Sequence, residues 1–239
     1  TLDEGNTITV TVVGGDNDQI TSIESITGSA GNDIIIGDSF DNVFSGAGGD
    51  DIFDGADGDD HLYGNEGQDS FVSGRGDDIY EGGDGLDNLD YSVAPGGVSV
   101  DLTVNTAFND GFGNQDTIRT IENIIGTDDA DIITGDSEIN EIIAGDGDDV
   151  IRGGLGSDTL DGGDGTRDEI HFDDLRGNGI TLDIDQGTAF YPEDASTDDI
   201  SGFELYYATG QDDVIRGSAA IDTIHAAAGD DSIAASMGE

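Results

Sequence analysis

The chain has 239 residues, of which 34% are hydrophobic and 6% aromatic, and this composition is thin for a conventional globular core. Its formal net charge of −49, from 55 acidic against six basic residues, excludes nucleic acid and anionic membrane surfaces as direct partners. Cysteine is absent, so disulfides cannot stabilise the fold. Low hydrophobicity with high net charge predicts a chain that stays disordered unless cations bind to it.

Residues 1–27 are expected to form opening strands that cap the fold. They begin with an alternating apolar segment, TITVTVV at 7–13, followed by a polar loop and a second apolar segment. The same pattern of strand, loop and strand returns twice. Its first strand is then GVSVDL at 97–102 or GITLDI at 179–184. We therefore predict two connectors, at 91–125 and 174–207, between longer repetitive regions.

Residues 46–90 divide into five consecutive nine-residue segments: GAGGDDIFD, GADGDDHLY, GNEGQDSFV, SGRGDDIYE and GGDGLDNLD. Glycine dominates positions 1 and 4 of each segment, aspartate holds position 6, and a large apolar residue holds position 8. This period predicts a coil of two half-turns, in which a tight loop alternates with a very short strand. Loops two segments apart then stack at the inter-strand spacing of about 4.7–4.9 Å.

Stacked loops place carboxylate above carboxylate, and this repulsion repeats at every layer unless a cation lies between them. Calcium accepts six or more oxygen ligands at about 2.3–2.6 Å, from carboxylates and backbone carbonyls, and so suits this spacing. Glycine has no Cβ and lets the loop turn its carbonyls inward. The pattern therefore predicts a column of calcium ions.

At these residues the sequence resembles the calcium-binding nonapeptide repeats of RTX (repeats-in-toxin, hemolysin-type) proteins, whose consensus is GGxGxDxUx. The resemblance implies an all-β fold, a right-handed parallel β-roll (β-solenoid) with calcium between loops i and i+18. It also implies a bacterial protein that leaves the cell unfolded by type I secretion and folds outside. We expect the chain to be a piece of a longer protein.

We expect three rolls, at 28–90, 126–173 and 208–239, with about nine calcium ions between position-6 residues of stacked loops. In roll one the expected ligands are Asp33, Asp51, Asp60, Asp69, Asp78 and Asp87, with Asn42 as a weaker ligand. In roll two they are Asp131, Asp149 and Asp158, with weaker Asn140, and Asp168 if Thr166–Arg167 contains a one-residue insertion. The short roll three offers Asp213 and Asp231, with weaker Asp222.

Other chemistry-bearing residues are expected to be structural. Position 8 should face the core, so its aromatic residues should pack inside: Phe44, Phe53, Phe71 and Tyr80. Position 5 should face solvent as an acidic surface, with outer-sphere calcium as the alternative, at Asp50, Asp59, Asp77 and Asp148. The repeat register assembles no zinc or catalytic site from His61, His171 and His225.

The leading functional hypothesis is a calcium-dependent structural module, a stalk or appendage, of a secreted bacterial RTX protein. The chain contains no HExxH and no GxSxG motif, so we expect no enzyme here, although such repeats accompany secreted epimerases, proteases and lipases.

A further alternative is an adhesive or surface-layer module that binds a cell-surface polysaccharide or protein. Such a contact would use connector aromatics, although part of them should instead cap a roll: Phe108, Phe112, Phe190, Tyr191, Tyr206 and Tyr207. No apolar run approaches the roughly 20 residues of a membrane span.

Overall fold

The structure is a computed structural model that describes residues 10–11, 24–172 and 177–235. Most of the predicted opening strand at 7–13 lies outside the described residues, as does the predicted boundary between roll two and the second connector at 173–174. The described part consists of short strands and one 3-10 helix, η1 (Leu102–Val104). The prediction of an all-β parallel β-roll is confirmed. None of the described helices has the length and apolar character needed to cross a membrane.

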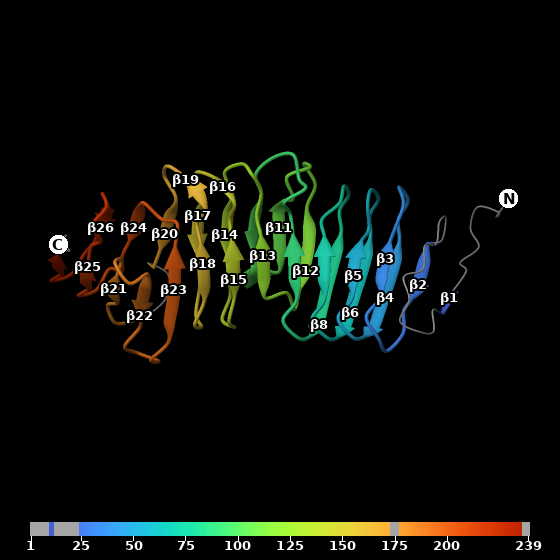
Figure 1. Ribbon diagram of the computed structural model, residues 1–239, viewed down its shortest axis with the longest axis horizontal. Helices are drawn as coiled ribbons and strands as arrows, with labels where there is room; N and C mark the ends of the chain where they lie inside the picture. Colours follow the sequence, from blue (N-terminus) through green and yellow to red (C-terminus); the bar gives the residue numbers. More distant parts are fainter. Residues whose placement is uncertain (1–9, 12–23, 173–176, 236–239) are drawn as a thin grey trace. The chain divides into compact units, whose positions relative to one another are not determined.

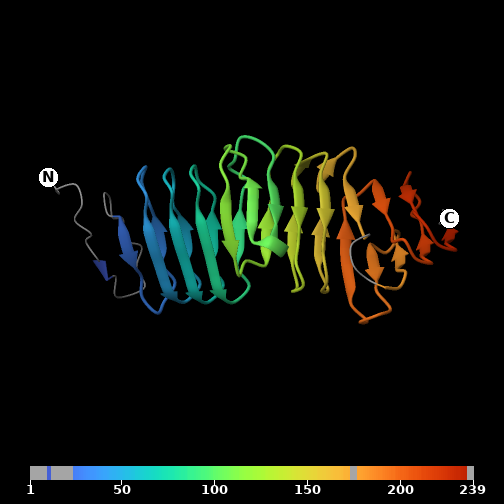
Figure 2. The ribbon, with the colours of Figure 1, turned by 180° about the vertical axis from the view of Figure 1, so that it is seen from behind.

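Unit 1 consists of the described parts of 1–95 and 104–125. Its strands form two sheets, and from residue 25 to residue 90 successive strands along the chain alternate between them (Figures 1 and 2). In order, the first sheet contains β1 (Val10–Thr11), β2 (Ser25–Thr27), β4 (Val43–Gly48), β6 (His61–Glu66), β8 (Ile79–Asp84), β12 (Asp116–Arg119) and β11 (Thr106–Asn109). The second contains β3 (Ile34–Ile36), β5 (Ile52–Asp54), β7 (Ser70–Val72), β9 (Asn88–Asp90) and β13 (Asn123–Ile125).

Unit 2 consists of 96–103 and the described parts of 126–239. Its first sheet contains, in order, β10 (Ser99–Asp101), β14 (Ile132–Thr134), β17 (Val150–Arg152), β20 (Glu169–His171), β24 (Leu205–Tyr207) and β26 (Thr223–His225). Its second contains β15 (Glu141–Ile143), β18 (Thr159–Asp161), β23 (Thr197–Ser201), β22 (Thr188–Phe190), β21 (Thr181–Asp183), β25 (Val214–Arg216) and β27 (Ser232–Ala234). Two short loop strands, β16 (Asp146–Gly147) and β19 (Asp164–Gly165), pair with each other.

The register follows the repeat. Phe44 of β4 lies opposite Leu62 of β6, and Phe53 of β5 lies opposite Phe71 of β7, so equivalent positions of alternate segments pair. The middle residue of most three-residue strands is buried because side chains alternate along a strand, whereas Ile233 of the last strand, β27, is 54% exposed. Phe44, Phe53, Phe71 and Tyr80 are all 0–1% exposed, which confirms the prediction that position 8 forms the core. The rings of Phe53 and Phe71 stack with centroids 5.0 Å apart.

Each connector continues the two sheets of its unit and adds an antiparallel hairpin. In the first connector, β12 pairs in parallel with β8 and β13 pairs with β9, whereas β11 pairs antiparallel with β12. In the second, β23 pairs with β18 and β24 with β20, whereas β22 runs antiparallel to both β21 and β23. The stacking of layers thus passes through the connectors, which the nine-residue period alone did not predict.

The connector aromatics divide into buried and exposed residues. Tyr191 and Tyr206 are 4% and 5% exposed, which confirms the expectation that part of these aromatics pack in the core rather than on a partner surface. They are buried because each caps the core of unit 2, where Tyr191 contacts Phe172 and Tyr206 contacts Phe203. In contrast, Phe108 and Phe190 are 57% and 38% exposed.

Candidate metal centre

A ladder of hydrogen bonds joins the position-6 residues of alternate segments. The backbone N–H of each residue donates to Oδ1 of the residue 18 positions later, for example from Asp51 to Asp69 at 2.8 Å. The other such pairs in roll one are Asp33 to Asp51, Asn42 to Asp60, Asp60 to Asp78 and Asp69 to Asp87. Those in unit 2 are Asp131 to Asp149, Asn140 to Asp158 and Asp213 to Asp231, together with Asp149 to Asp168, which are 19 positions apart. The structure therefore brings the predicted ligands together in columns.

The second carboxylate oxygen of many ladder residues has no hydrogen-bond partner although it is buried. This holds for Oδ2 of Asp51, Asp60, Asp69, Asp87, Asp149 and Asp168. A buried carboxylate oxygen left without a partner costs about 1–3 kcal/mol or more, because it loses its hydration and gains nothing in return. A bound cation would supply the missing partner, so these atoms fit calcium.

Glycine at position 1 leaves room beside these oxygens. A Cβ added to Gly46 would collide with the carboxylate of Asp51, and one added to Gly55 would collide with that of Asp60. A Cβ on Gly64 would meet both the Asp69 carboxylate and the carbonyl oxygen of Gly82, the latter at 2.6 Å. Carboxylate and carbonyl oxygens thus face one small space, and this is the donor set that calcium prefers.

Position 4 supplies the turn that shapes each loop. Gly49, Gly58, Gly67 and Gly76 have φ values of 101°, 122°, 134° and 136°, a region that side chains with a Cβ rarely adopt. Their recurrence gives these four loops the same turn. The repeat therefore places equivalent oxygen atoms in equivalent positions in these layers.

Burial raises the pKa of several ladder carboxyl groups, and neighbouring carboxylates add to this effect. The pKa of Asp51 rises to about 7, mainly because of burial and then because of Asp69 and Asp33. For the same kind of reason the pKa of Asp60 rises to about 8 and that of Asp149 to about 7. Without metal, ionisation of these groups near neutral pH is therefore costly, and a cation among them would lower that cost.

No group of three or more His, Cys, Asp or Glu side chains surrounds one metal position in the described part of the chain. Each layer instead offers one or two carboxylates, and backbone carbonyls would have to complete the ligand shell. Such an oxygen set fits calcium better than zinc, which prefers nitrogen and sulfur ligands. The histidines form ring stacks instead, since His171 and His225 both stack on Tyr207, at centroid distances of 4.2 and 4.3 Å.

The ladder includes four acidic residues that the sequence analysis missed. Asp78 N–H donates to Asp116 and Asp87 N–H donates to Glu122, at 3.1 and 2.9 Å. In unit 2, Asp158 donates to Asp198 and Asp168 donates to Glu204, both at 3.0 Å. A signal did exist for two of them, because DTI at 116–118 and DDI at 198–200 repeat the spacing of position-6 aspartate and position-8 apolar residue.

Asp168 enters the ladder with a separation of 19 residues from Asp149. This confirms that one residue is inserted in its segment. Asn42 also keeps the ladder geometry, since its N–H donates to Asp60 at 2.7 Å, but its side-chain Nδ2 is buried without a hydrogen-bond partner. Its side-chain Oδ1 accepts the N–H of Asp38 at 3.2 Å, and its weaker role as a ligand stays a prediction.

Position 5 forms a second, outer ladder that runs in the opposite direction. Asp50, Asp59, Asp77 and Asp148 are exposed, which confirms that this position faces solvent. Here the N–H of the later residue donates to the earlier side chain, as from Asp77 to Asp59 Oδ1 at 2.9 Å and from Gln68 to Asp50 Oδ1 at 3.0 Å. The outer carboxylates thus link layers through the backbone as well as forming an acidic surface.

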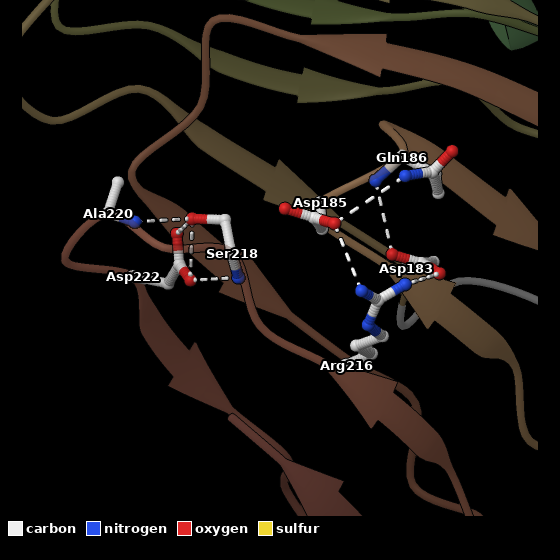
Figure 3. A network of polar contacts seen from close by, with 7 residues as sticks. All are labelled: Asp183, Asp185, Gln186, Arg216, Ser218, Ala220 and Asp222. Atoms are coloured by element: carbon white, nitrogen blue, oxygen red, sulfur yellow. Dashed lines mark hydrogen bonds and ion pairs between the residues drawn. The ribbon is translucent and has the colours of Figure 1, made fainter. Parts of the chain in front are cut away.

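Roll three carries the least buried ligands. Asp213 is 1% exposed, but Asp231 and Asp222 are only half-buried. Asp222 accepts hydrogen bonds from the backbone and hydroxyl of Ser218 at 2.7 and 2.9 Å (Figure 3). Beside it, Arg216 of β25 binds Asp183 and Asp185 of the connector at 3.1 and 3.0 Å (Figure 3). Side-chain hydrogen bonds and ion pairs at the surface therefore stabilise the last layers of roll three.

A parallel β-roll with glycine loops, stacked aspartates and buried unpartnered carboxylate oxygens defines a calcium-binding repeat module. Comparison with protein families agrees, because the RTX calcium-binding nonapeptide repeat model matches four times, at residues 27–62, 54–89, 134–167 and 207–239. These matches cover more than half of the chain, which therefore belongs to the RTX calcium-binding nonapeptide repeat family. No curated protein matches the sequence.

Proposed function

We propose that this chain is a structural module of a secreted bacterial protein that folds when it meets calcium outside the cell. The observation that carries the proposal is the set of buried Oδ2 atoms without partners, at Asp51, Asp60 and Asp69. The loops that carry these oxygens stack only in the folded coil, so the binding sites do not exist in the unfolded chain. Calcium binding and folding are then one equilibrium.

The affinity expected of such sites agrees with this location. Extracellular calcium modules bind with dissociation constants of about 10⁻⁴–10⁻³ M, which keeps them metal-free in the cytosol. The formal charge of −49 would hold the metal-free chain open, and each bound ion would remove two charges of the excess. Folding after export agrees with these two properties, the similarity to RTX repeats favours export by a type I system, and a folded roll would serve as a rigid stalk or appendage. The proposal assigns no catalytic role to this chain.

A second candidate is an adhesive module that holds a saccharide or protein through its connectors. Support comes from Phe108 of β11 and Phe190 of β22, which are exposed at equivalent places in the two connector hairpins. Each is the last residue of a TAF sequence, so the same ring is presented twice. Exposed aromatic rings are common in binding surfaces.

Circular dichroism of the chelated chain during calcium titration tests the leading proposal, with magnesium at equal concentration as the control. We expect a cooperative transition from coil to β-structure with calcium alone. A β-spectrum that chelation leaves unchanged would contradict the proposal. The adhesive candidate is tested separately, by glycan-array binding of the calcium-loaded chain and of a Phe108→Ala, Phe190→Ala variant.

A further inference from the structure

The ladder carboxylates fall into two classes, according to whether a side-chain hydroxyl reaches their second oxygen. Asp51, Asp60, Asp69 and Asp87 have a buried Oδ2 with no partner. Oδ2 of Asp78 instead accepts a hydrogen bond from the hydroxyl of Tyr80, at 2.9 Å. We call the first class open and the second class hydroxyl-capped.

Both connectors contain a hydroxyl-capped carboxylate. Tyr91 donates its hydroxyl to Oδ2 of Asp116 at 3.2 Å in unit 1, and Tyr191 donates to Oδ2 of Asp198 at 2.6 Å in unit 2. In each pair Oδ1 accepts the ladder N–H of the preceding layer. Both oxygens of these aspartates are therefore satisfied by protein groups.

Serine and threonine cap the aspartates that begin each roll. Their hydroxyl groups lie 2.8–3.2 Å from a carboxylate oxygen four residues later, and the backbone N–H of the same residue donates to that carboxylate as well. The pairs are Ser29 with Asp33, Thr127 with Asp131, Thr209 with Asp213, and Ser218 with Asp222. Hydroxyl caps therefore lie at the first aspartate of each roll and at Asp78, Asp116, Asp198 and Asp222, whereas the open carboxylates include Asp87 and Asp168, which precede Glu122 and Glu204 of the connectors.

We propose that these hydroxyl groups determine which layers bind calcium, so that open carboxylates ligate the ion and hydroxyl-capped carboxylates do not. This inference rests on the proposed calcium binding. A hydroxyl proton that points at a buried oxygen already satisfies it and presents partial positive charge to any cation approaching the same atom. In each unit the caps would end one of the two calcium columns, at Asp78 and Asp116 in unit 1 and at Asp198 in unit 2, without leaving an unpaired carboxylate buried there.

Position 8 offers a direct comparison within roll one. Tyr80 follows the capped Asp78 by two residues, and Phe71 follows the open Asp69 by the same two residues. Both rings are buried, at 1% and 0% exposure, and they contact each other edge to face with centroids 5.8 Å apart. The presence of a hydroxyl is therefore the main difference between the two layers, and it can be exchanged in both directions.

The test is to count the calcium ions bound by the full chain, by native mass spectrometry and by isothermal titration calorimetry with calcium alone. Tyr80→Phe should bind one ion more than the wild type, because Oδ2 of Asp78 becomes open. Phe71→Tyr should bind one ion fewer, because a hydroxyl would then cap Asp69. Tyr63→Phe is the matched control, since its hydroxyl bonds to His61 on the outer face at 3.0 Å, and the count should not change.

Circular dichroism in saturating calcium shows whether each variant folds, and Tyr91→Phe, which opens Asp116, repeats the gain of one ion at a second place. A wild type that binds calcium together with Tyr80→Phe and Tyr91→Phe variants that bind the same number would overturn the inference while leaving the proposed function intact. A wild type that binds no calcium would overturn both.

Discussion

The backbone N–H of Asp78 donates a hydrogen bond to Oδ1 of Asp116 across 38 residues of sequence, at 3.1 Å. Asp116 is 1% exposed, and its other oxygen accepts the hydroxyl of Tyr91. This one carboxylate therefore joins the last nonapeptide layer on its side of roll one to the first connector. In a further repeat, the acceptor for the Asp78 N–H would be a position-6 aspartate. Asp116 takes the place of that aspartate, so the hydrogen-bond ladder continues into the connector.

Replacing Asp116 by alanine should destabilise the calcium-loaded chain. The substitution leaves two buried donors without acceptors, the N–H of Asp78 and the hydroxyl of Tyr91, at a cost of about 1–3 kcal/mol each. Chemical denaturation in saturating calcium measures the loss. Asp84→Ala removes an exposed carboxylate and should cost less than about 0.5 kcal/mol. Equal losses in the two variants would contradict the role assigned to Asp116.

Asp60→Ala should weaken calcium-dependent folding more than Asp59→Ala. Asp60 is 2% exposed, accepts the N–H of Asn42 and keeps an unpartnered oxygen for the ion, whereas Asp59 is exposed. Loss of a hydrogen bond to a charged group costs about 1.5–3 kcal/mol, so the calcium midpoint should rise about tenfold or more for Asp60→Ala. Titrations that give both variants the same midpoint would show that the assigned register is wrong.

The metal-free chain should be more structured in acid than at neutral pH. An aspartate whose pKa is higher in the folded chain binds more protons when folded, so its contribution to stability is present at low pH and is lost as the pH rises through the folded pKa. The folded values range from about 6 for Asp87 to about 8 for Asp60, against about 3.9 in an unfolded chain. Chelated protein should therefore lose stability progressively from about pH 4, where the unfolded chain begins to ionise, to about pH 8, and should lose its β-structure within this range.

Circular dichroism in chelator across this range measures the effect, and the calcium-saturated protein is the control. Bound calcium keeps the carboxylates ionised and competes with protons, so the calcium midpoint should rise as the pH falls. A chelated chain that is more structured at pH 8 than at pH 5 would show that the ladder carboxylates do not control folding.

Gly46→Ala should impair calcium binding in roll one, because its Cβ would occupy space taken by the Asp51 carboxylate. Gly31→Ala is the matched control within the same roll, since its Cβ would meet only the Ser29 hydroxyl, at 3.9 Å. We expect a calcium midpoint several-fold higher for Gly46→Ala and little change for Gly31→Ala, measured by calcium titration with circular dichroism. Similar shifts for both would mean that the effect of alanine comes from backbone flexibility and not from the space beside the carboxylate.

The nine-residue period was enough to predict the parallel coil, its core and the stacking of carboxylates. Each segment repeats the same nine-residue pattern, so the positions of Phe53, Asp60 and Phe71 in the fold follow from the register alone. The insertion before Asp168 was also predictable, because its segment otherwise keeps the pattern. The periodic residue pattern is therefore sufficient to predict the coil, its core and the stacked carboxylates.

The connectors could not be predicted to the same depth. Asp116 and Asp198 lie 38 and 40 residues from their ladder partners because a hairpin is inserted between the layers. The length of such an insertion is set by tertiary packing, which no repeat register encodes. The hydroxyl of Tyr80 was missed for a different reason, since position 8 was read only as an apolar core position and its polar end was not considered.

A crystal structure grown with calcium tests the central claim most directly, through anomalous scattering that locates the ions. We predict peaks within about 2.3–2.6 Å of Oδ2 of Asp51, Asp60 and Asp69, with backbone carbonyls completing each ligand shell. Water molecules at these oxygens, with calcium absent or bound only to the exposed position-5 carboxylates, would contradict the account.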